Sequence, residues 1–334
     1  MSMELDVLVI GTATRDVFVK SPHFKVETDE QSRTGRKMSI ALGEKLEVPD
    51  VYFCTGGGGT NVAVGFARQG FKTGCVTRMG DDVSGRDIKE EFVKEGLIDL
   101  SQVDPAKPTA YSLILVAPDG ERTILEHRGA NEKFFEDQID WANIRSKWLF
   151  MDSFSDNLEL LKRAVDWAKN NGTKIAYNPG KKMVAMGTGL QPYLEGIDVL
   201  ICNEDEASLI TGIAPMRTKE IFVALDHIAT EVAVMTRGPK GVIVSDKKNV
   251  YTAGIPDSPV VERTGAGDSF CSGFLSGYIE TGDIKHSIQL GTANATSVVL
   301  YYGGKQGLLK RGDWGQYPKV DVQTSTIEVA FNVV

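Results

Sequence analysis

The feature that most constrains the fold is a regular alternation of short apolar runs and amphipathic helical patterns in the second half of the chain. Runs at Trp148–Met151 and Lys174–Tyr177 are typical of buried strands, and a helical pattern at Asn157–Lys169 separates them. Alternation of this kind predicts a mainly parallel sheet covered by helices on both faces. We therefore expect one three-layer α/β domain over residues 1–334, a length ample for a sizeable core.

The N-terminal run Leu5–Ile10 is expected to be the first strand and not a targeting segment. It carries Asp6, and no basic region precedes it. The sequence contains no run of about 18 apolar residues, so no membrane span is expected. A formal net charge of −8 without a basic block disfavours nucleic acid and anionic membranes as partners. Cytoplasmic localisation and a small-molecule substrate are the resulting expectations.

The four cysteines and four histidines offer no metal or disulfide pattern. The cysteines form no C-x-x-C pair and lie in or beside apolar runs, which predicts free thiols in a reducing compartment. The histidines are scattered without the helical spacing of metal ligands.

Two segments, at about 17–55 and 109–127, interrupt the α/β pattern with short alternating strands. The second contains Pro118-Asp119-Gly120 between two such strands, which indicates a hairpin. We expect these segments to form a small β-sheet lid over a substrate site, and a homodimer through this lid is a further expectation. The expected apolar face of the sheet contains Ile40, Leu42, Val51, Phe53 and Leu113.

The strongest chemical motif is Thr264-Gly265-Ala266-Gly267-Asp268, directly before an amphipathic helix. Small residues at a helix N-terminus let backbone N–H groups approach an anion, as a transferring phosphoryl group requires. Asp268 falls in the first turn, where the helix should lower the pKa of its carboxyl group. A weak base suffices if it takes a hydroxyl proton late in the transfer. The alternative is that Asp268 merely caps the helix.

A second motif is the run Gly56-Gly57-Gly58-Gly59 followed by Thr60-Asn61 at the start of another helix. Four glycines are conformationally costly unless a ligand or another backbone must approach closely. No Gly-Lys-Ser/Thr follows, so this is not a Walker A loop. The glycine spacing also differs from the dinucleotide fingerprint, which argues against a nicotinamide dehydrogenase. A tight turn without a ligand is the alternative.

Together these motifs resemble the ribokinase-like family, also called the phosphofructokinase-B carbohydrate kinases. Further landmarks of that family fit in the same order over about residues 5 to 307. They are the segments Gly11–Asp16, Met79–Gly85, Asn203–Glu206 and Thr236–Gly241.

The resemblance implies an ATP-dependent kinase that phosphorylates a sugar hydroxyl, and it implies roles for the matching residues. The catalytic base would be Asp268, with an anion hole from Gly265, Ala266 and Gly267. Substrate hydroxyls would meet Asp16, Gly57 and Asn61. Magnesium would be ordered through water by Asn203 and Glu206. The nucleotide would contact Thr236, Gly238, Gly241 and, on its base side, Asn294.

The chain departs from the family pattern at Glu262-Arg263, where members usually carry Asp-Thr. In the family that Asp commonly helps to bind a monovalent cation next to the anion hole. Arg263 either replaces the charge of the cation or points to solvent, so dependence on potassium is left open.

Several alternatives are open at this point. The spacing of Asn203 and Glu206 also fits a helix capping box, and Asp16 is equally compatible with a solvated loop. The enzyme is either a sugar kinase or a nucleoside kinase of the same family. A retired member that binds a sugar or nucleotide as a regulator is the third hypothesis, although Asp268 and both glycine segments are intact. A free sugar is favoured over a sugar phosphate because no Arg/Lys cluster lies near the substrate motifs.

Overall fold

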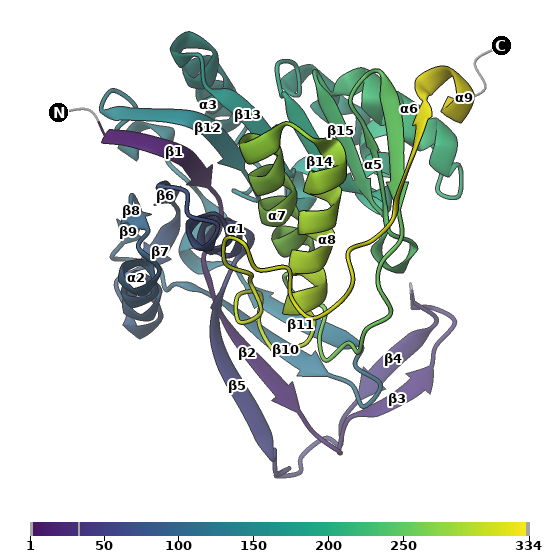
Figure 1. Ribbon diagram of the computed structural model, residues 1–334. Helices are drawn as coiled ribbons and strands as arrows, with labels where there is room; N and C mark the ends of the chain where they lie inside the picture. Colours follow the sequence, from purple (N-terminus) through teal and green to yellow (C-terminus); the bar gives the residue numbers. More distant parts are fainter. Residues whose placement is uncertain (1–2, 33, 332–334) are drawn as a thin grey trace.

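A computed structural model of the chain describes residues 3–32 and 34–331, which form a sheet of ten strands between two layers of helices (Figure 1). The strand order is β18-β17-β16-β15-β14-β13-β12-β1-β6-β8. Neighbours from β15 to β8 are parallel, and β16, β17 and β18 extend the sheet in antiparallel fashion. The strands are β1 (Met3–Ile10), β6 (Thr73–Val76), β8 (Ile98–Asp99), β12 (Ile144–Met151), β13 (Lys174–Tyr177), β14 (Val199–Asn203), β15 (Val232–Thr236), β16 (Val242–Ser245), β17 (Asn249–Ala253) and β18 (Val322–Thr326).

The two faces of this sheet bury separate cores, because successive side chains of a strand point to opposite sides. In β1, Leu8 and Ile10 belong to one core and Val7 and Val9 to the other. The first core lies under α3 (Leu158–Asn171), α4 (Lys181–Val184), α5 (Glu204–Thr211) and α6 (Thr218–Ile228). The second lies under α1 (Gly58–Arg68), α2 (Val83–Glu95), α7 (Ala266–Thr281) and α8 (Ile284–Val298). The predicted three-layer α/β class is confirmed.

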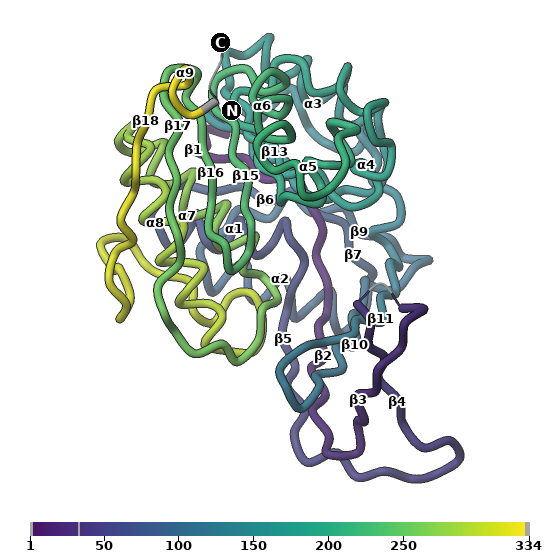
Figure 2. The backbone as a smooth tube through the Cα atoms, turned by 90° about the vertical axis from the view of Figure 1, so that its right-hand side faces the viewer, coloured from purple at the N-terminus to yellow at the C-terminus, as the bar shows by residue number. Residues whose placement is uncertain are grey.

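A separate four-stranded sheet projects from the main body, with the order β11-β10-β2-β5 (Figure 2). Its strands are β2 (Thr14–Lys20), β5 (Asp50–Gly56), β10 (Ala110–Val116) and β11 (Arg122–His127). A hairpin of β3 (Lys25–Thr28) and β4 (Arg36–Ser39) lies beyond it. The sheet therefore begins at Thr14, slightly earlier than the expected insertion.

The expected apolar face of the small sheet needs a correction. Ile40 and Leu42 follow β4 and lie in a loop outside the sheet, exposed to solvent. The register instead aligns Phe53, Val17, Leu113 and Leu125 in one row across all four strands. Leu125 was missed because β11 reads Arg-Thr-Ile-Leu-Glu-His, which shows no regular alternation of apolar and polar residues.

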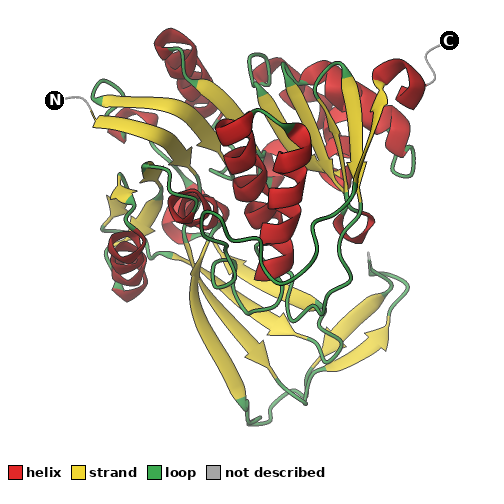
Figure 3. Ribbon diagram, viewed as in Figure 1, coloured by secondary structure: helices red, strands yellow, loops and turns green. Residues whose placement is uncertain are grey.

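Two elements at the C-terminus, β18 and α9 (Ile327–Phe331), were also not predicted. Strand β18 reads Val-Gln-Thr-Ser-Thr and pairs at the edge of the large sheet, so only Val322 is buried and the strand lacks an apolar run. Figure 3 shows it reached by a long irregular segment after α8.

The topology brings the predicted motifs to one edge of the large sheet. Gly11 follows β1, Asp152 follows β12, and Asn203 ends β14, so all three lie at the carboxyl ends of parallel strands. Open α/β sheets bind their ligands outside this edge. Both glycine-rich helix starts, of α1 and α7, belong to helices on the same face of the sheet.

Candidate active site

The start of helix α1 is held against the end of strand β1 by backbone contact that only glycine allows. A Cβ atom on Gly59 would lie 2.4 Å from the carbonyl carbon of Gly11. Gly57, with φ of 96°, is in a conformation that other residues rarely adopt. The Thr60 hydroxyl donates to the Gly56 carbonyl oxygen at 2.7 Å. The glycine run is thus a close-packed turn that fixes where Asn61 points.

The start of helix α7 is a second such turn. Gly265 has φ of 78°, and a Cβ atom there would lie 2.4 Å from the Cα of Gly304. Gly267, in contrast, faces open space, with no atom within 4 Å of the position that a Cβ would take. First-turn N–H groups of a helix have no intrahelical partner. The Ala266 N–H donates to the Arg263 carbonyl oxygen at 3.3 Å. The open space beside Gly267 leaves room for an anion to approach the helix start.

The two helix starts meet through one hydrogen bond. The Asn61 amide Nδ2 donates to Asp268 Oδ2 at 2.8 Å. The other end of this amide, Oδ1, is buried and has no hydrogen-bond partner among the residues that the structure describes. An orphaned buried acceptor next to a carboxylate is suited to receive a hydroxyl from a ligand. Asn61 and Asp268, predicted separately from two motifs, thus form one site.

The electrostatic expectation for Asp268 was wrong in its direction. Burial raises the pKa of the Asp268 carboxyl group above its ordinary value, and the nearby Asp16 carboxylate raises it further. The hydrogen bond from Asn61 and the charge of Lys305 lower the pKa but do not reverse the effect. Loss of hydration is the largest of these effects. Asp268 is consequently a stronger base than an ordinary aspartate.

Asp16 lies on β2 of the small sheet, at the base where this sheet joins the main body. It is 4% exposed, and its Oδ1 accepts a hydrogen bond from the Thr14 hydroxyl at 2.7 Å. Burial is the main cause that raises the pKa of its carboxyl group. The solvated-loop alternative for Asp16 is therefore excluded. A Cβ on Gly56 would lie 1.9 Å from Asp16 Oδ2, so the glycine run also makes room for this carboxylate.

A further carboxylate, Asp152, was missed by the sequence analysis. It follows β12, is 5% exposed, and its Oδ2 has no hydrogen-bond partner in the described part of the chain. A Cβ on Gly58 would lie 1.8 Å from this atom. Burial, together with repulsion from Asp268, raises the pKa of Asp152 well above its ordinary value. Its position directly after a buried parallel strand was the signal that could have revealed it.

Asn203 and Glu206 form the capping box that their spacing allows. Asn203 Oδ1 accepts from the Glu206 backbone N–H at 2.9 Å, and Glu206 Oε2 accepts from the Asn203 N–H at 2.8 Å. Burial is the main cause that raises the pKa of Glu206, and Asp268 contributes. The cap thus holds Glu206 within electrostatic range of Asp268. In residues 3–32 and 34–331, no three Asp, Glu, His or Cys side chains are grouped as direct ligands of a metal ion.

A cavity of about 330 Å³ adjoins the start of α7 and is lined by three of the residues predicted for the nucleotide. Thr236, Gly238 and Gly241 line it together with Ala266 and Gly267. Its other walls are mostly apolar, and α8 contributes one face of its helix. The residues of these walls that sequence reasoning missed are Val242, Ile255, Val260, Arg263, Phe270, Thr292, Ala295, Thr296 and Val299.

Asn294 does not line this cavity, contrary to expectation. It is 1% exposed, its Nδ2 donates to the Ser269 carbonyl oxygen at 2.7 Å, and its Oδ1 accepts from the Leu309 N–H at 2.9 Å. Both ends of the amide are therefore used inside the protein. Asn294 ties α8 to α7, while Thr292 and Thr296 of the same helix face the cavity.

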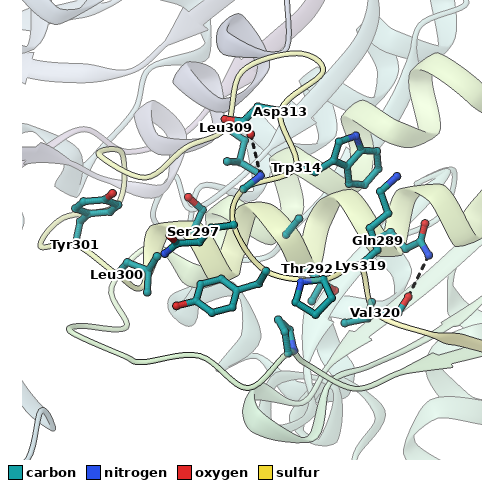
Figure 4. A pocket seen from close by; sticks show the side chains of 16 residues that line it. Gln289, Thr292, Ser297, Leu300, Tyr301, Leu309, Asp313, Trp314, Lys319 and Val320 are labelled. Atoms are coloured by element: carbon teal, nitrogen blue, oxygen red, sulfur yellow. Dashed lines mark hydrogen bonds between the residues drawn. The ribbon is translucent and has the colours of Figure 1, made fainter.

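A second cavity, of about 270 Å³, lies on the other side of α8 under the segment 309–320 (Figure 4). It shares Pro256 and Thr292 with the first cavity. Gln289 donates to the Val320 carbonyl oxygen at 3.1 Å, and Lys319 lies over the Trp314 ring. The Gln289 contact fastens the C-terminal segment to α8, and the Lys319 contact lies within the segment.

Comparison with known proteins agrees with this geometry. Residues 6–311 match the family described as pfkB family carbohydrate kinase. A ribokinase of Haemophilus influenzae is 27% identical over 317 residues, which cover 92% of this chain and 97% of that protein. A cytidine kinase of Thermococcus kodakarensis is 28% identical over 269 residues, covering 78% and 89%. The structure of Arabidopsis thaliana ribokinase complexed with ribose and ATP superimposes with a TM-score of 0.73 at 22% identity, covering 93% and 98%.

Replacing Asn61 by Ala is expected to raise the pKa of Asp268 further. The amide stabilises the ionised carboxylate by donating to it, so its loss favours the protonated form. The pKa can be followed by carbon-detected NMR of aspartate-labelled protein, with the Asp268 signal assigned from the Asp268→Asn variant. A pKa that stays the same or falls in Asn61→Ala would contradict this account of the contact.

Proposed function

The chain belongs to the pfkB family of carbohydrate kinases, and we propose that it transfers the γ-phosphoryl group of ATP to a hydroxyl of a free sugar, with Asp268 as the base. Membership makes the chain a phosphotransferase with an alcohol group as acceptor. The observation that carries the proposal is the Asn61–Asp268 hydrogen bond. It lies next to the turn 265–267, where Ala266 and Gly267 line the cavity. It joins a site for hydroxyl groups to a site for phosphate.

The cavity beside α7 supports ATP as the donor. Its apolar walls suit a flat base, and Gly238 and Gly267 leave backbone room for the ribose and phosphates. Placed there, a nucleotide would direct its γ-phosphate to the first turn of α7, which carries partial positive charge. The related ribokinase from Arabidopsis was solved with ribose and ATP, which is consistent with one ligand on each side of this turn.

In the proposed step the protein forms no covalent bond to the substrates. The acceptor oxygen forms a bond to the γ-phosphorus, the bond from that phosphorus to the bridging oxygen breaks, and ADP leaves. The hydroxyl proton passes to the Asp268 carboxylate. Backbone N–H groups of 265–267 stabilise charge on the transferring group. The raised pKa of Asp268 assists proton transfer, and it also means that activity should fall as pH decreases through that raised value.

Magnesium fits this site as a cofactor held mainly through water. The carboxyl group of Asp152 is buried and that of Glu206 half-buried near Asp268. Burial is the main cause that raises the pKa of each, and repulsion from Asp268 contributes. Mg²⁺ keeps most of its water and binds through one or two carboxylates plus phosphate oxygens. With the nucleotide bound, the ion would neutralise phosphate charge, and Asn203 would fix Glu206 in place through the capping box.

The substrate side favours a neutral polyol over a sugar phosphate. Asp16, Asn61 and Asp152 offer acceptor oxygens, as hydroxyl donors require. The nearest cations are already paired: Arg15 with Asp87 and Lys305 with Glu91, both at 2.8 Å. A phosphate group would have to compete for them.

A nucleoside kinase is the alternative within the same family, and a cytidine kinase is among the relatives. A non-catalytic regulator would not need the base, yet Asp268 and both glycine turns are in place. A coupled assay of ADP release against free sugars, sugar phosphates and nucleosides distinguishes these possibilities. Turnover with a free sugar supports the proposal, turnover with a nucleoside alone supports the alternative, and none with either supports a regulator.

Replacing Asp268 by Asn should reduce turnover by roughly 10²–10⁴-fold, the usual contribution of a general base. The substitution keeps the shape of the side chain and removes its ability to take a proton. ATP affinity, measured by calorimetry, should remain nearly unchanged because the cavity walls do not include Asp268. If the variant keeps wild-type turnover at saturating substrate, Asp268 is not the base and serves only as a helix cap.

The small sheet should close over the sugar when both substrates are bound. It carries Asp16, and its inner face packs Phe18 and Ile114 with Tyr302 of the main body. Closure would keep water from the phosphoryl group. Hydrogen exchange in residues 14–20 and 110–116 is expected to slow with sugar and a non-hydrolysable ATP analogue together. If exchange in both segments is the same with and without saturating ligands, the small sheet does not act as a lid.

The outer face of the same sheet is proposed to pair two copies of the chain. Phe53 and Leu125 are 61% and 54% exposed and lie at the two ends of the row formed with Leu113 and the buried Val17. Exposed apolar side chains of this kind favour association. Light scattering should report a dimer for the wild type and a monomer for Phe53→Asp. Val93→Asp, at an 83% exposed position on α2, is the matched control and should remain a dimer. A monomeric wild type would contradict this proposal.

A further inference from the structure

The carboxylate of Glu262, just before the anion-hole turn, is completely buried. Its side chain is 0% exposed, and it holds the turn through Thr264. Oε2 accepts from the Thr264 backbone N–H at 2.7 Å, and Oε1 accepts from the Thr264 hydroxyl at 2.7 Å. The Glu262 N–H in turn donates to the Val299 carbonyl oxygen at 3.2 Å, at the end of α8. Glu262 therefore holds in place the segment that leads into Gly265 and the first turn of α7.

The counter-charge for this carboxylate comes from the small sheet. Arg122, the first residue of β11, places its Nε 2.9 Å from Glu262 Oε1. No other cationic side chain within residues 3–32 and 34–331 lies at ion-pair distance from Glu262. Arg263, the neighbour in sequence, is exposed and lines the nucleotide cavity instead. The pair thus joins the small sheet to the loop before α7, which carries the turn 265–267.

We propose that Arg122 is a positioning residue, which keeps the anion-hole turn in its active geometry only while the small sheet is docked. This inference rests on the proposed kinase function. A buried carboxylate left without its partner is strongly unfavourable. Without Arg122, Glu262 would move toward water. That movement weakens the hold on the Thr264 N–H, and the backbone donors at 265–267 would shift from the transferring phosphoryl group.

The same pair leaves no room for a monovalent cation at Glu262. Such an ion needs several free oxygen ligands, but both oxygens of Glu262 already accept hydrogen bonds from Thr264, and Oε1 also faces the guanidinium. A second positive charge next to Arg122 would be repelled. The cation that the family resemblance implies does not fit these residues, so transfer should not require potassium.

Steady-state kinetics of Arg122→Ala test the inference, with Arg128→Ala as the matched control. Arg128 pairs with Glu126 on the same sheet and does not contact Glu262. Arg122→Ala should lower kcat on the order of tenfold to hundredfold, with KM for sugar and ATP within about twofold. Guanidinium ion at non-denaturing concentration, or the Arg122→Lys variant, should restore part of kcat. The wild type should be equally active in potassium and in a bulky organic cation.

Hydrogen exchange separates this inference from the kinase proposal because it needs no turnover. Exchange in residues 262–268 should be faster in Arg122→Ala than in the wild type, and unchanged in Arg128→Ala. The inference is overturned if exchange and kcat of Arg122→Ala match those of the control. It is also overturned if the loss of kcat in Arg122→Ala is explained by a loss of thermal stability and guanidinium does not restore kcat. A wild type that requires potassium would overturn it as well. A wild type inactive on all substrates would contradict the proposed function, and exchange alone would then decide the role of Arg122.

Discussion

The hydrogen bond between the Asn61 amide and the Asp268 carboxylate joins two helix starts that are about 200 residues apart in sequence. Each start is brought there by a glycine in backbone contact, Gly59 on Gly11 and Gly265 on Gly304. Larger residues at these positions would push the helices away from the sheet edge. The geometry of the hydroxyl site and of the phosphate site therefore depends on the same few close contacts.

Burial sets the electrostatic character of the site. Asp16, Asp152 and Asp268 all have carboxyl groups with raised pKa values, chiefly because the protein removes their water. A helix N-terminus alone would have made Asp268 more acidic. Under the proposed function, a bound metal–nucleotide and a sugar rich in hydroxyl donors would offset this concentrated negative charge. Glu262 differs from these carboxylates, since Arg122 neutralises it within the protein.

The three-layer fold and the two glycine turns were predictable because they follow from local patterns. Strand and helix periods fixed the layers, and the Asn203–Glu206 spacing correctly indicated a capping box. Arg122 was not predicted, since its role depends on Glu262, a partner far away in sequence. Asp152 was missed although it directly follows a buried parallel strand. Asn294 was misplaced. In the same helix, Thr292 and Thr296 face the cavity. Asn294 lies between them in sequence but points toward α7 in the protein interior.

The central claim is that one turn, 265–268, receives the phosphoryl group while Asp268 receives the hydroxyl proton. A crystal structure of the protein with its sugar and a non-hydrolysable ATP analogue tests it most directly. The account predicts an acceptor hydroxyl within about 2.6–3.2 Å of an Asp268 oxygen, and the γ-phosphate on the backbone N–H groups of 265–267. A γ-phosphate bound elsewhere, or an acceptor hydroxyl that contacts a different carboxylate and not Asp268, would contradict it.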